Sequence, residues 1–109
     1  MTAACLILTT FPDSDQAREI AEHLVERQLL ACVNLLSPCE SIYRWEGKLC
    51  RENEVPAIMK TSEDRVKELE AAFFDLHPYE VPEFLVIRPD SGSEAYLEWL
   101  VRQTDGGVS

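Results

Sequence analysis

Apolar positions recur along the chain with strand spacing in some segments and helix spacing in others. Residues 3–11 form a short apolar run rich in strand formers, and Pro12 ends it. Asp13, followed three residues later by Gln16, resembles a capping box, so a helix is predicted from there to about Leu29. Its apolar stripe, at helical spacing, consists of Ala17, Ile20, Ala21, Leu24 and Val25.

A long hairpin is predicted across residues 31–61. Its first arm combines the apolar run 32–36 with the extended segment 41–45. Gly47 gives the turn the backbone freedom that it needs, and residues 48–59 return as the second arm. Charged side chains near the turn indicate that the tip of the hairpin stands in solvent.

A second helix and a fourth strand follow the hairpin. Thr61 or Ser62 is placed to cap a helix that is predicted to reach Leu76. Two prolines exclude helix from the loop 77–82, and a strand is predicted over 84–87. The buried stripe of the second helix is predicted to consist of Val66, Leu69, Phe73 and Leu76.

Ser93 is placed to cap a short final helix, and the tail from about Thr104 is predicted to fray. The 109 residues fit one domain, 1–109, with the element order β-α-β-β-α-β plus a helix. This order predicts an α+β fold, the ferredoxin-like split β-α-β, with an antiparallel sheet and both main helices on one face. We expect another subunit to cover the opposite face.

Alternation along the second arm of the hairpin supports this assembly. Val55 and Met59 point to one side, while Glu54, Ile58 and Lys60 point to the other. The middle of the arm is therefore apolar on both sides, as expected where one side meets helices and the other meets a neighbour. Glu54 and Lys60 flank this centre. They are interpreted as an ion pair at the rim of an interface, or alternatively as part of a pocket for a polar ligand.

Large aromatic residues near the hairpin turn have no core of their own to enter. Tyr43 and Trp45 alternate on the first arm, and Trp99 lies off the main stripe of the final helix. Exposed aromatic side chains of this kind favour contacts between subunits. With Ile58 they form the predicted subunit interface.

Charge excludes several classes of partner. Twenty acidic residues against 10 basic ones give a formal net charge of -10. Such a surface repels the phosphates of nucleic acids and of anionic membranes. No apolar run approaches the roughly 20 residues that span a bilayer, and the first apolar stretch lacks the preceding basic residues of a signal peptide. A cytoplasmic protein is expected.

The cysteines do not predict a disulfide or a zinc motif. Cys39 and Cys50 flank the hairpin turn, but a turn centred on Glu46 and Gly47 places Cys39 opposite Glu54 and Cys50 opposite Tyr43. The four cysteines, none of them in a C-x-x-C pair, are Cys5, Cys32, Cys39 and Cys50.

Cys32 and His77 are the residues that the sequence offers for chemistry. Each follows a helix, and we expect the two helix exits at the same end of the sheet, where the side chains could approach. Two interpretations stay open: a catalytic Cys–His pair, or a binding site for a soft or borderline metal ion. The sequence contains no G-x-S-x-G, P-loop, G-x-G-x-x-G or H-E-x-x-H motif, so the protein is not expected to be an enzyme. The other histidine, His23, is expected on the surface.

Five segments together resemble the divalent-cation tolerance protein CutA family. They are LLACVN at 29–34, SIYRWEGK at 41–48, EVPAIMKT at 54–61, HPYEVPE at 77–83 and YLEWL at 96–100. The resemblance implies a ferredoxin-like subunit in a homotrimer, related in shape to PII signalling proteins. It also implies an association with tolerance to copper and other divalent cations.

The resemblance further implies candidate site residues. Enteric members use a first-strand Cys and a His pair before Pro-Tyr as proposed copper ligands, and the corresponding residues here are Thr9, Leu76 and His77. The one cofactor that the resemblance implies is copper or another divalent ion, with His77 and Cys32 as candidate ligands. The implied ligand pocket, beside the 77–83 loop, consists of Glu54, Lys60, Tyr79 and Glu83.

Two functions follow from these residues. The first is a homotrimer that responds to divalent metal ions through His77 and Cys32. The second is a PII-like scaffold that binds a small anion or a protein partner, with Lys60 central and the metal incidental.

Overall fold

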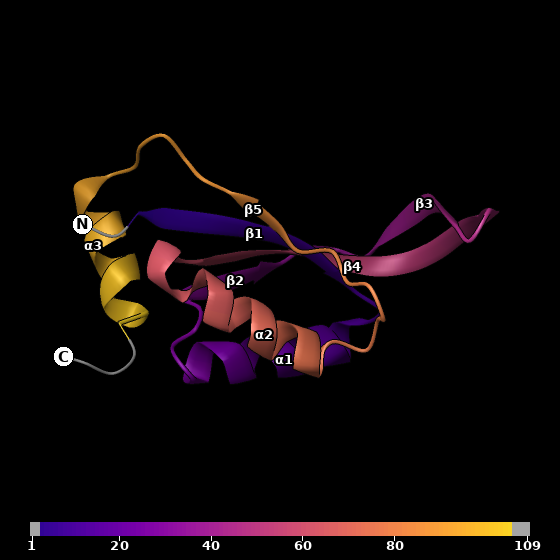
Figure 1. Cartoon of the computed structure of the whole chain (residues 1–109), viewed down its shortest axis with the longest axis horizontal. Helices are drawn as coiled ribbons and strands as arrows, with labels where there is room; N and C mark the ends of the chain where they lie inside the picture. The colour runs from indigo at the N-terminus through magenta and orange to yellow at the C-terminus, as the bar shows by residue number, and fades with distance from the viewer. Residues whose placement is uncertain (1–2, 106–109) are drawn as a thin grey trace.

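The central sheet of the computed structural model, which describes residues 3–105, contains five strands in an antiparallel arrangement. The strand order is β2-β4-β1-β5, and β3 pairs with β4 beyond the end of β2. Helices α1 and α2 lie side by side on one face, and α3 lies at one end (Figure 1). The elements are β1 (Ala4–Phe11), α1 (Ser14–Glu26), β2 (Cys32–Leu35), β3 (Cys39–Trp45), β4 (Lys48–Ser62), the 3-10 turn η1 (Glu63–Arg65), α2 (Val66–Leu76), β5 (Leu85–Ile87) and α3 (Glu94–Gln103). The predicted α+β split β-α-β fold is confirmed.

The core lies between the sheet and the two main helices. Ile7 of β1 and Met59 of β4 point into it and are fully buried, as are Leu24 of α1 and Phe73 of α2. Burying each such side chain contributes roughly 1.5–3 kcal/mol. The register that brings these residues together is fixed by the alternation of β1 and β4, which pair from Ala4↔Ser62 to Phe11↔Val55.

Helix α1 begins as predicted but ends earlier. The Asp13 carboxylate accepts a hydrogen bond from the Gln16 backbone N–H at 2.8 Å, which caps the first turn. At the other end Gln28 adopts a φ of 59°, and the Leu29 N–H bonds the Leu24 carbonyl, a Schellman ending. Val25, in the last turn, is 38% exposed, so the prediction that it joins the buried stripe is wrong.

The start of α2 and the end of α3 also differ from the prediction. Strand β4 continues to Ser62, whose hydroxyl lies 2.9 Å from that of Thr104 and caps no helix. Thr104 is 1% exposed, so the predicted fraying does not begin there, and residues 106–109 lie outside the described part of the chain. Leu76, predicted to be buried, ends α2 on its exposed side.

The hairpin of β3 and β4 projects beyond the rest of the subunit, whose longest dimension is 47 Å (Figure 1). Its turn places Glu46 at φ 50° and Gly47 at φ 79°, a left-handed pair that matches the twist of the strands. The predicted register is confirmed, with Cys39 opposite Glu54 and Tyr43 opposite Cys50. All four cysteines are free.

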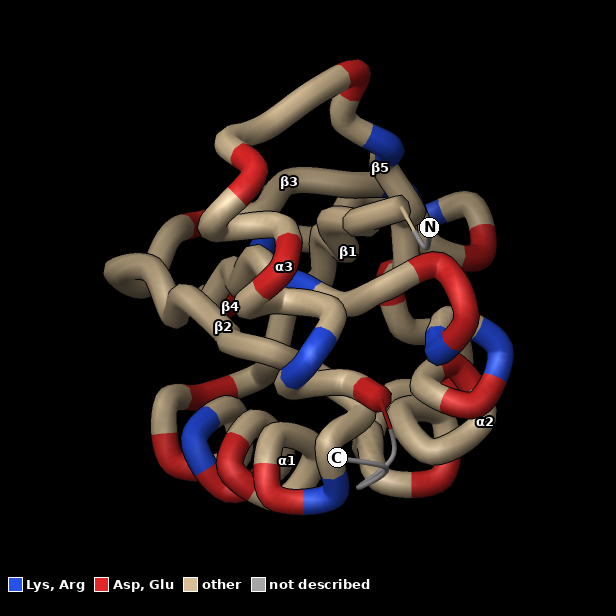
Figure 2. The backbone as a smooth tube through the Cα atoms, turned by 90° about the vertical axis from the view of Figure 1, so that its left-hand side faces the viewer, with Lys and Arg blue, Asp and Glu red and all other residues tan. Residues whose placement is uncertain are grey.

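The face of the sheet opposite α1 and α2 is not covered by a helix over its centre (Figure 1), and the residues there are largely apolar. Leu6 and Leu8 of β1 alternate with buried residues and therefore point to this face, where they pair across to Ile87 and Leu85. Leu85 is 57% exposed and Ile87 is 43% exposed. Acidic residues, by contrast, line both helices of the other layer (Figure 2). The chain thus has one charged layer and one sheet face that is apolar over its centre.

Candidate functional site

A cavity of about 590 Å³ opens where the hairpin leaves the body of the subunit. One wall comes from β3 and β4, and the loop 79–83 forms the other. Even-numbered positions of β4 face it, so the cavity continues the uncovered sheet face onto the hairpin. We call it the hairpin-base groove; its lining includes Tyr43, Trp45, Glu52, Glu54, Tyr79 and Glu83.

Glu54 is the most buried charged residue of this groove, with 8% of its surface exposed. One carboxylate oxygen, Oε2, accepts hydrogen bonds from the Tyr79 hydroxyl at 2.7 Å and from Thr10 Oγ1 at 3.2 Å. Burial, and then the hydrogen bond and charge of Glu54, raise the pKa of Tyr79 well above its usual range, so its hydroxyl remains a donor. Within residues 3–105 no Lys or Arg forms an ion pair with Glu54.

His77 fixes the loop that forms the second wall. Its Nδ1 accepts the Tyr79 backbone N–H at 3.1 Å, which leaves Nε2 protonated to donate to the Thr10 carbonyl at 2.8 Å. The ring stacks on Phe11 with centroids 5.3 Å apart. Burial lowers the pKa of His77, against the opposing influence of the Thr10 hydrogen bond and the Glu54 charge. The imidazole is therefore neutral, buried and hydrogen-bonded on both nitrogens.

The structure does not bring His77 and Cys32 together, and this prediction is wrong within the subunit. Cys32 pairs with Lys60, whereas His77 bonds to Thr10. These positions are four residues apart along β1, about 13 Å at strand spacing, because Lys60 lies opposite Leu6. The reason is topological: α1 and α2 follow antiparallel strands, so they end at opposite ends of the sheet.

Thr9 and Leu76, which stand where the resemblance would have a Cys and a His, do not replace those ligands. Thr9 points into the core and is 2% exposed, with its hydroxyl lacking a hydrogen-bond partner among the described residues. Leu76 has no ligating atom. Across residues 3–105 no three His, Cys, Asp or Glu side chains are placed to hold one metal ion.

Lys60 lies outside the hairpin-base groove, so the predicted pocket is only partly assembled. Glu54, Tyr79 and Glu83 line the groove, as expected. Lys60 is six residues further along β4, about 20 Å from Glu54 at strand spacing, and its Nζ sits 5.9 Å from the centre of the Tyr96 ring. The sequence analysis did not predict Thr10 as a groove residue. Strand alternation could have done so, because Thr10 lies on the same side of β1 as Leu6 and Leu8, and this is the side of the sheet that carries Glu54.

The residues predicted for a subunit interface are all accessible. Tyr43 is 39% exposed and Trp45 is 44% exposed on the groove side of the hairpin. Ile58 lies on the uncovered sheet face opposite Asn34, and Trp99 is partly buried beside Tyr96, with ring centroids 5.6 Å apart. Their role in assembly stays a prediction.

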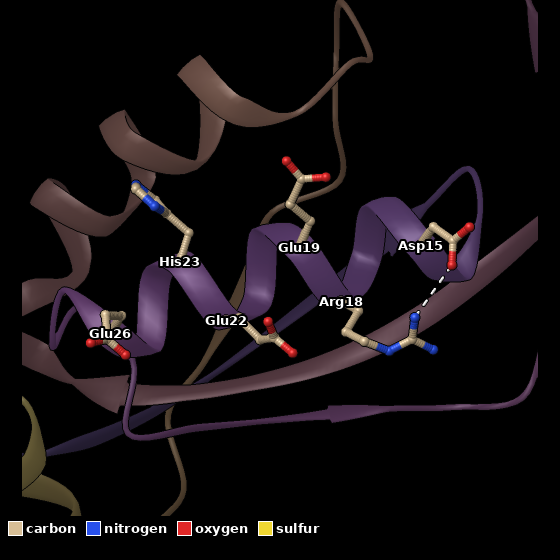
Figure 3. Close-up of a pocket in the computed structure, with 6 residues that line it drawn as sticks. All are labelled: Asp15, Arg18, Glu19, Glu22, His23 and Glu26. Atoms are coloured by element: carbon tan, nitrogen blue, oxygen red, sulfur yellow. Dashed lines mark hydrogen bonds and ion pairs between the residues drawn. The ribbon is translucent and has the colours of Figure 1, made fainter.

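A second, shallow hollow runs along the outer face of α1 (Figure 3). Glu19 and His23 point in one direction, while Glu22 and Arg18 leave the helix elsewhere. Arg18 pairs with Asp15, at 3.3 Å. His23 is on the surface, as predicted, and the side chains do not converge on a site.

Known proteins match the chain over nearly its whole length. The family model described as CutA1 divalent ion tolerance protein matches residues 5–103. The chain belongs to this family. It is 41% identical to the divalent-cation tolerance protein CutA of Pyrococcus horikoshii, over 91% of this chain and 96% of the relative.

Solved CutA structures share the fold. The divalent cation tolerance protein from Thermus thermophilus superposes with a TM-score of 0.89 at 38% identity, covering 93% of this chain and 98% of that one. The Archaeoglobus fulgidus CutA, described as periplasmic, gives a TM-score of 0.89 at 30% identity, covering 94% and 99% of the two chains. Within residues 3–105 no helix is both long and apolar enough to cross a bilayer.

Proposed function

We propose that this chain acts in the tolerance of divalent cations as a homotrimeric binding protein of the cytoplasm, without catalytic activity. The names of its relatives support the link to divalent cations. The observation that carries the assembly is the uncovered sheet face, where Leu85 and Ile87 are 57% and 43% exposed. An exposed apolar surface of this kind is typical of a face that another copy covers.

A copper or other divalent ion would have to be held by more than one subunit. Both nitrogens of His77 are engaged, and Cys32 lies at the other end of the sheet. Carboxylates of the groove, such as Glu52 and Glu83, supply oxygen ligands of the kind that hard cations prefer. The geometry thus favours an intersubunit site rather than a prebuilt site inside one chain.

Growth and calorimetry test this function. Deleting the gene for this chain is expected to sensitise cells to Cu²⁺ or Zn²⁺, and the wild-type chain is expected to restore growth. Ile58→Asp, which places a charge on the uncovered face, should fail to restore it, whereas Lys67→Met on the outside of α2 should succeed. Unchanged sensitivity after deletion would contradict the proposal. Titration of the assembled protein with the same ions then shows whether it binds them directly.

The size of the groove favours a second candidate, a PII-like scaffold that binds a ligand or a partner segment. Its volume of about 590 Å³ lies within the range of roughly 300–1,000 Å³ that is typical of ligand pockets. Its carboxylates favour a cationic group over the anion that the sequence led us to consider. Thermal-shift screening should find ligands whose effect is lost in Glu83→Gln; hits indifferent to that change would contradict this candidate.

A further inference from the structure

Two charged residues on the uncovered sheet face have no partner of opposite charge among the described residues of their own subunit. Glu54 and Lys60 occupy the same face of β4, with Pro56 and Ile58 between them. The side-chain hydrogen bonds that Glu54 accepts come from neutral hydroxyl groups. Between residues 3 and 105, the ammonium group of Lys60 contacts the Tyr96 ring and forms no ion pair.

Burial makes the isolated charge of Glu54 unfavourable. The residue is 8% exposed, and a buried carboxylate is stabilised chiefly when a cation accompanies its hydrogen bonds. Glu52, Glu80 and Glu83 border the same groove and add negative charge. Within residues 3–105, the chain itself therefore places no cation beside these carboxylates.

The layout of β4 indicates where such a cation comes from. If the Lys60 end of one copy meets the Glu54 end of the next, the cation and the anion lie together at the interface between two different patches. Subunits in a closed ring meet through two different patches, so such an arrangement repeats at every interface. The exposed residues Tyr43 and Trp45 would flank the contact on the groove side.

We propose that Lys60 of each subunit forms an ion pair with Glu54 of the next subunit, which completes the hairpin-base groove. The inference rests on the proposed homotrimer and adds a specific pairing to it. The groove then contains a lysine after all, contributed by the neighbouring copy. Its net charge becomes less negative, and ligand binding in the groove becomes coupled to assembly.

A double-mutant cycle on the full-length chain tests the pairing. Glu54→Gln keeps an acceptor for the Tyr79 hydroxyl, and Lys60→Met keeps an unbranched side chain but removes the ammonium group. Light scattering over a dilution series should show that each change raises the dissociation constant of the oligomer about tenfold or more. The dissociation constant of the double variant should be no higher than that of the single variant with the larger effect. Independent effects that multiply would overturn the pairing.

Charge exchange gives a second measurement. Lys60→Glu alone places like charges together and should dissociate the oligomer, while adding Glu54→Lys to the same chain should restore assembly. Lys67→Glu, an equal change of charge on the outer face of α2, is the matched control and should leave assembly unchanged. Circular dichroism verifies that each variant folds. If Glu54→Lys does not fold, the cycle of Glu54→Gln and Lys60→Met tests the pairing.

The outcomes separate this inference from the proposed function. A monomeric wild-type chain contradicts both. A wild-type trimer that is indifferent to Lys60→Met and Lys60→Glu contradicts only the pairing and leaves the proposed homotrimer standing. The pairing is established if the wild-type chain is a trimer, the effects of the two single substitutions do not add, and the charge exchange restores assembly.

Discussion

His77 and Glu54 hold the 77–83 loop against the base of the hairpin from two sides. His77 bonds the Thr10 carbonyl, and Glu54 bonds the hydroxyls of Thr10 and Tyr79. Thr10 and Tyr79 each contact both residues, so these four side chains and their backbone form one polar network. Its members are partly or fully buried, which makes each hydrogen bond more consequential than one at the surface.

The buried imidazole of His77 predicts a pH-dependent stability. Burial holds its pKa below the ordinary value of 6.5 in the folded chain, so between the two values only the unfolded chain takes up the proton. The free energy of unfolding should be highest above pH 6.5 and fall as the pH drops toward the folded pKa. The slope from one proton is at most about 1.4 kcal/mol per pH unit. Urea denaturation between pH 5.5 and 7.5 measures it.

His77→Gln retains a donor for the Thr10 carbonyl but has no proton to exchange, so its stability should vary less over this window. His23→Gln, on the exposed face of α1, is the matched control and should keep the wild-type slope. Equal slopes in all three proteins would contradict this account of His77.

Removing the Tyr79 hydroxyl should destabilise the subunit. Tyr79→Phe leaves Glu54 with one fewer donor, and hydrogen bonds to charged groups contribute about 1.5–3 kcal/mol. We expect the lower part of that range because Tyr79 is only partly buried. Tyr96→Phe, a change at an exposed tyrosine on α3, should alter the free energy of unfolding far less. Chemical denaturation measures both.

At the scale of elements, the turn of the hairpin fixes the register of both its arms. Glu46 and Gly47 adopt left-handed conformations, and the ladder from Trp45↔Lys48 to Cys39↔Glu54 follows without a break. Between β3 and β2 the register along β4 then shifts by one residue, around Pro38. Such a bulge re-aims side chains, so the groove depends on the turn and on this shift together.

Gly47→Ala tests the turn. A Cβ at this position would meet no atom within 4 Å, so the expected cost is conformational and not steric. An alanine with φ near +79° should lower the free energy of unfolding by about 1 kcal/mol. Lys48→Ala, in the neighbouring strand position, controls for loss of a side chain; a loss of stability equal to that of Gly47→Ala would contradict the explanation.

Local signals predicted the elements well and the contacts between them less well. The Asp13 cap, the Gly47 turn and the alternation of β4 each depend on neighbours in sequence, and all three are confirmed. The end of α1 was missed because Gln28, and not a glycine, takes the left-handed position. The separation of Cys32 from His77, and of Lys60 from the groove, follows from strand direction and distance along β4, which residue spacing alone did not convey.

At the scale of the molecule, the helical layer and the sheet layer have different surfaces, one acidic and the other apolar over its centre. The helical layer carries much of the acidic surface behind the net charge of -10 (Figure 2). The centre of the sheet face exposes apolar residues between Glu54 and Lys60, and further charges lie on the hairpin and on the 79–83 loop. In the proposed homotrimer the acidic layers would repel one another and the sheet faces would associate, which favours a closed oligomer over indefinite growth.

Light scattering should give a mass of about three times 12.4 kDa, the mass of one chain. A monomer would contradict the account of the sheet face. Trp45→Ala should weaken assembly by about 2 kcal/mol if this 44%-exposed aromatic anchors the interface. Phe74→Ala, an equally exposed aromatic on the helical layer, is the control and should leave the mass unchanged at every dilution.

If the proposed homotrimer forms, the projecting hairpin also determines what happens to a chain that stays unassembled. Residues 48–54 of β4 hydrogen-bond to β3 alone among the described strands, since β1 ends opposite Val55, and β5 pairs only with β1. A solitary subunit therefore presents unpaired strand edges next to exposed Leu85 and Ile87, a combination that templates indiscriminate strand addition. Variants that disrupt assembly should accumulate as insoluble aggregates in the cell more readily than as free monomers, so their harm would come from protein quality control as well as from lost function.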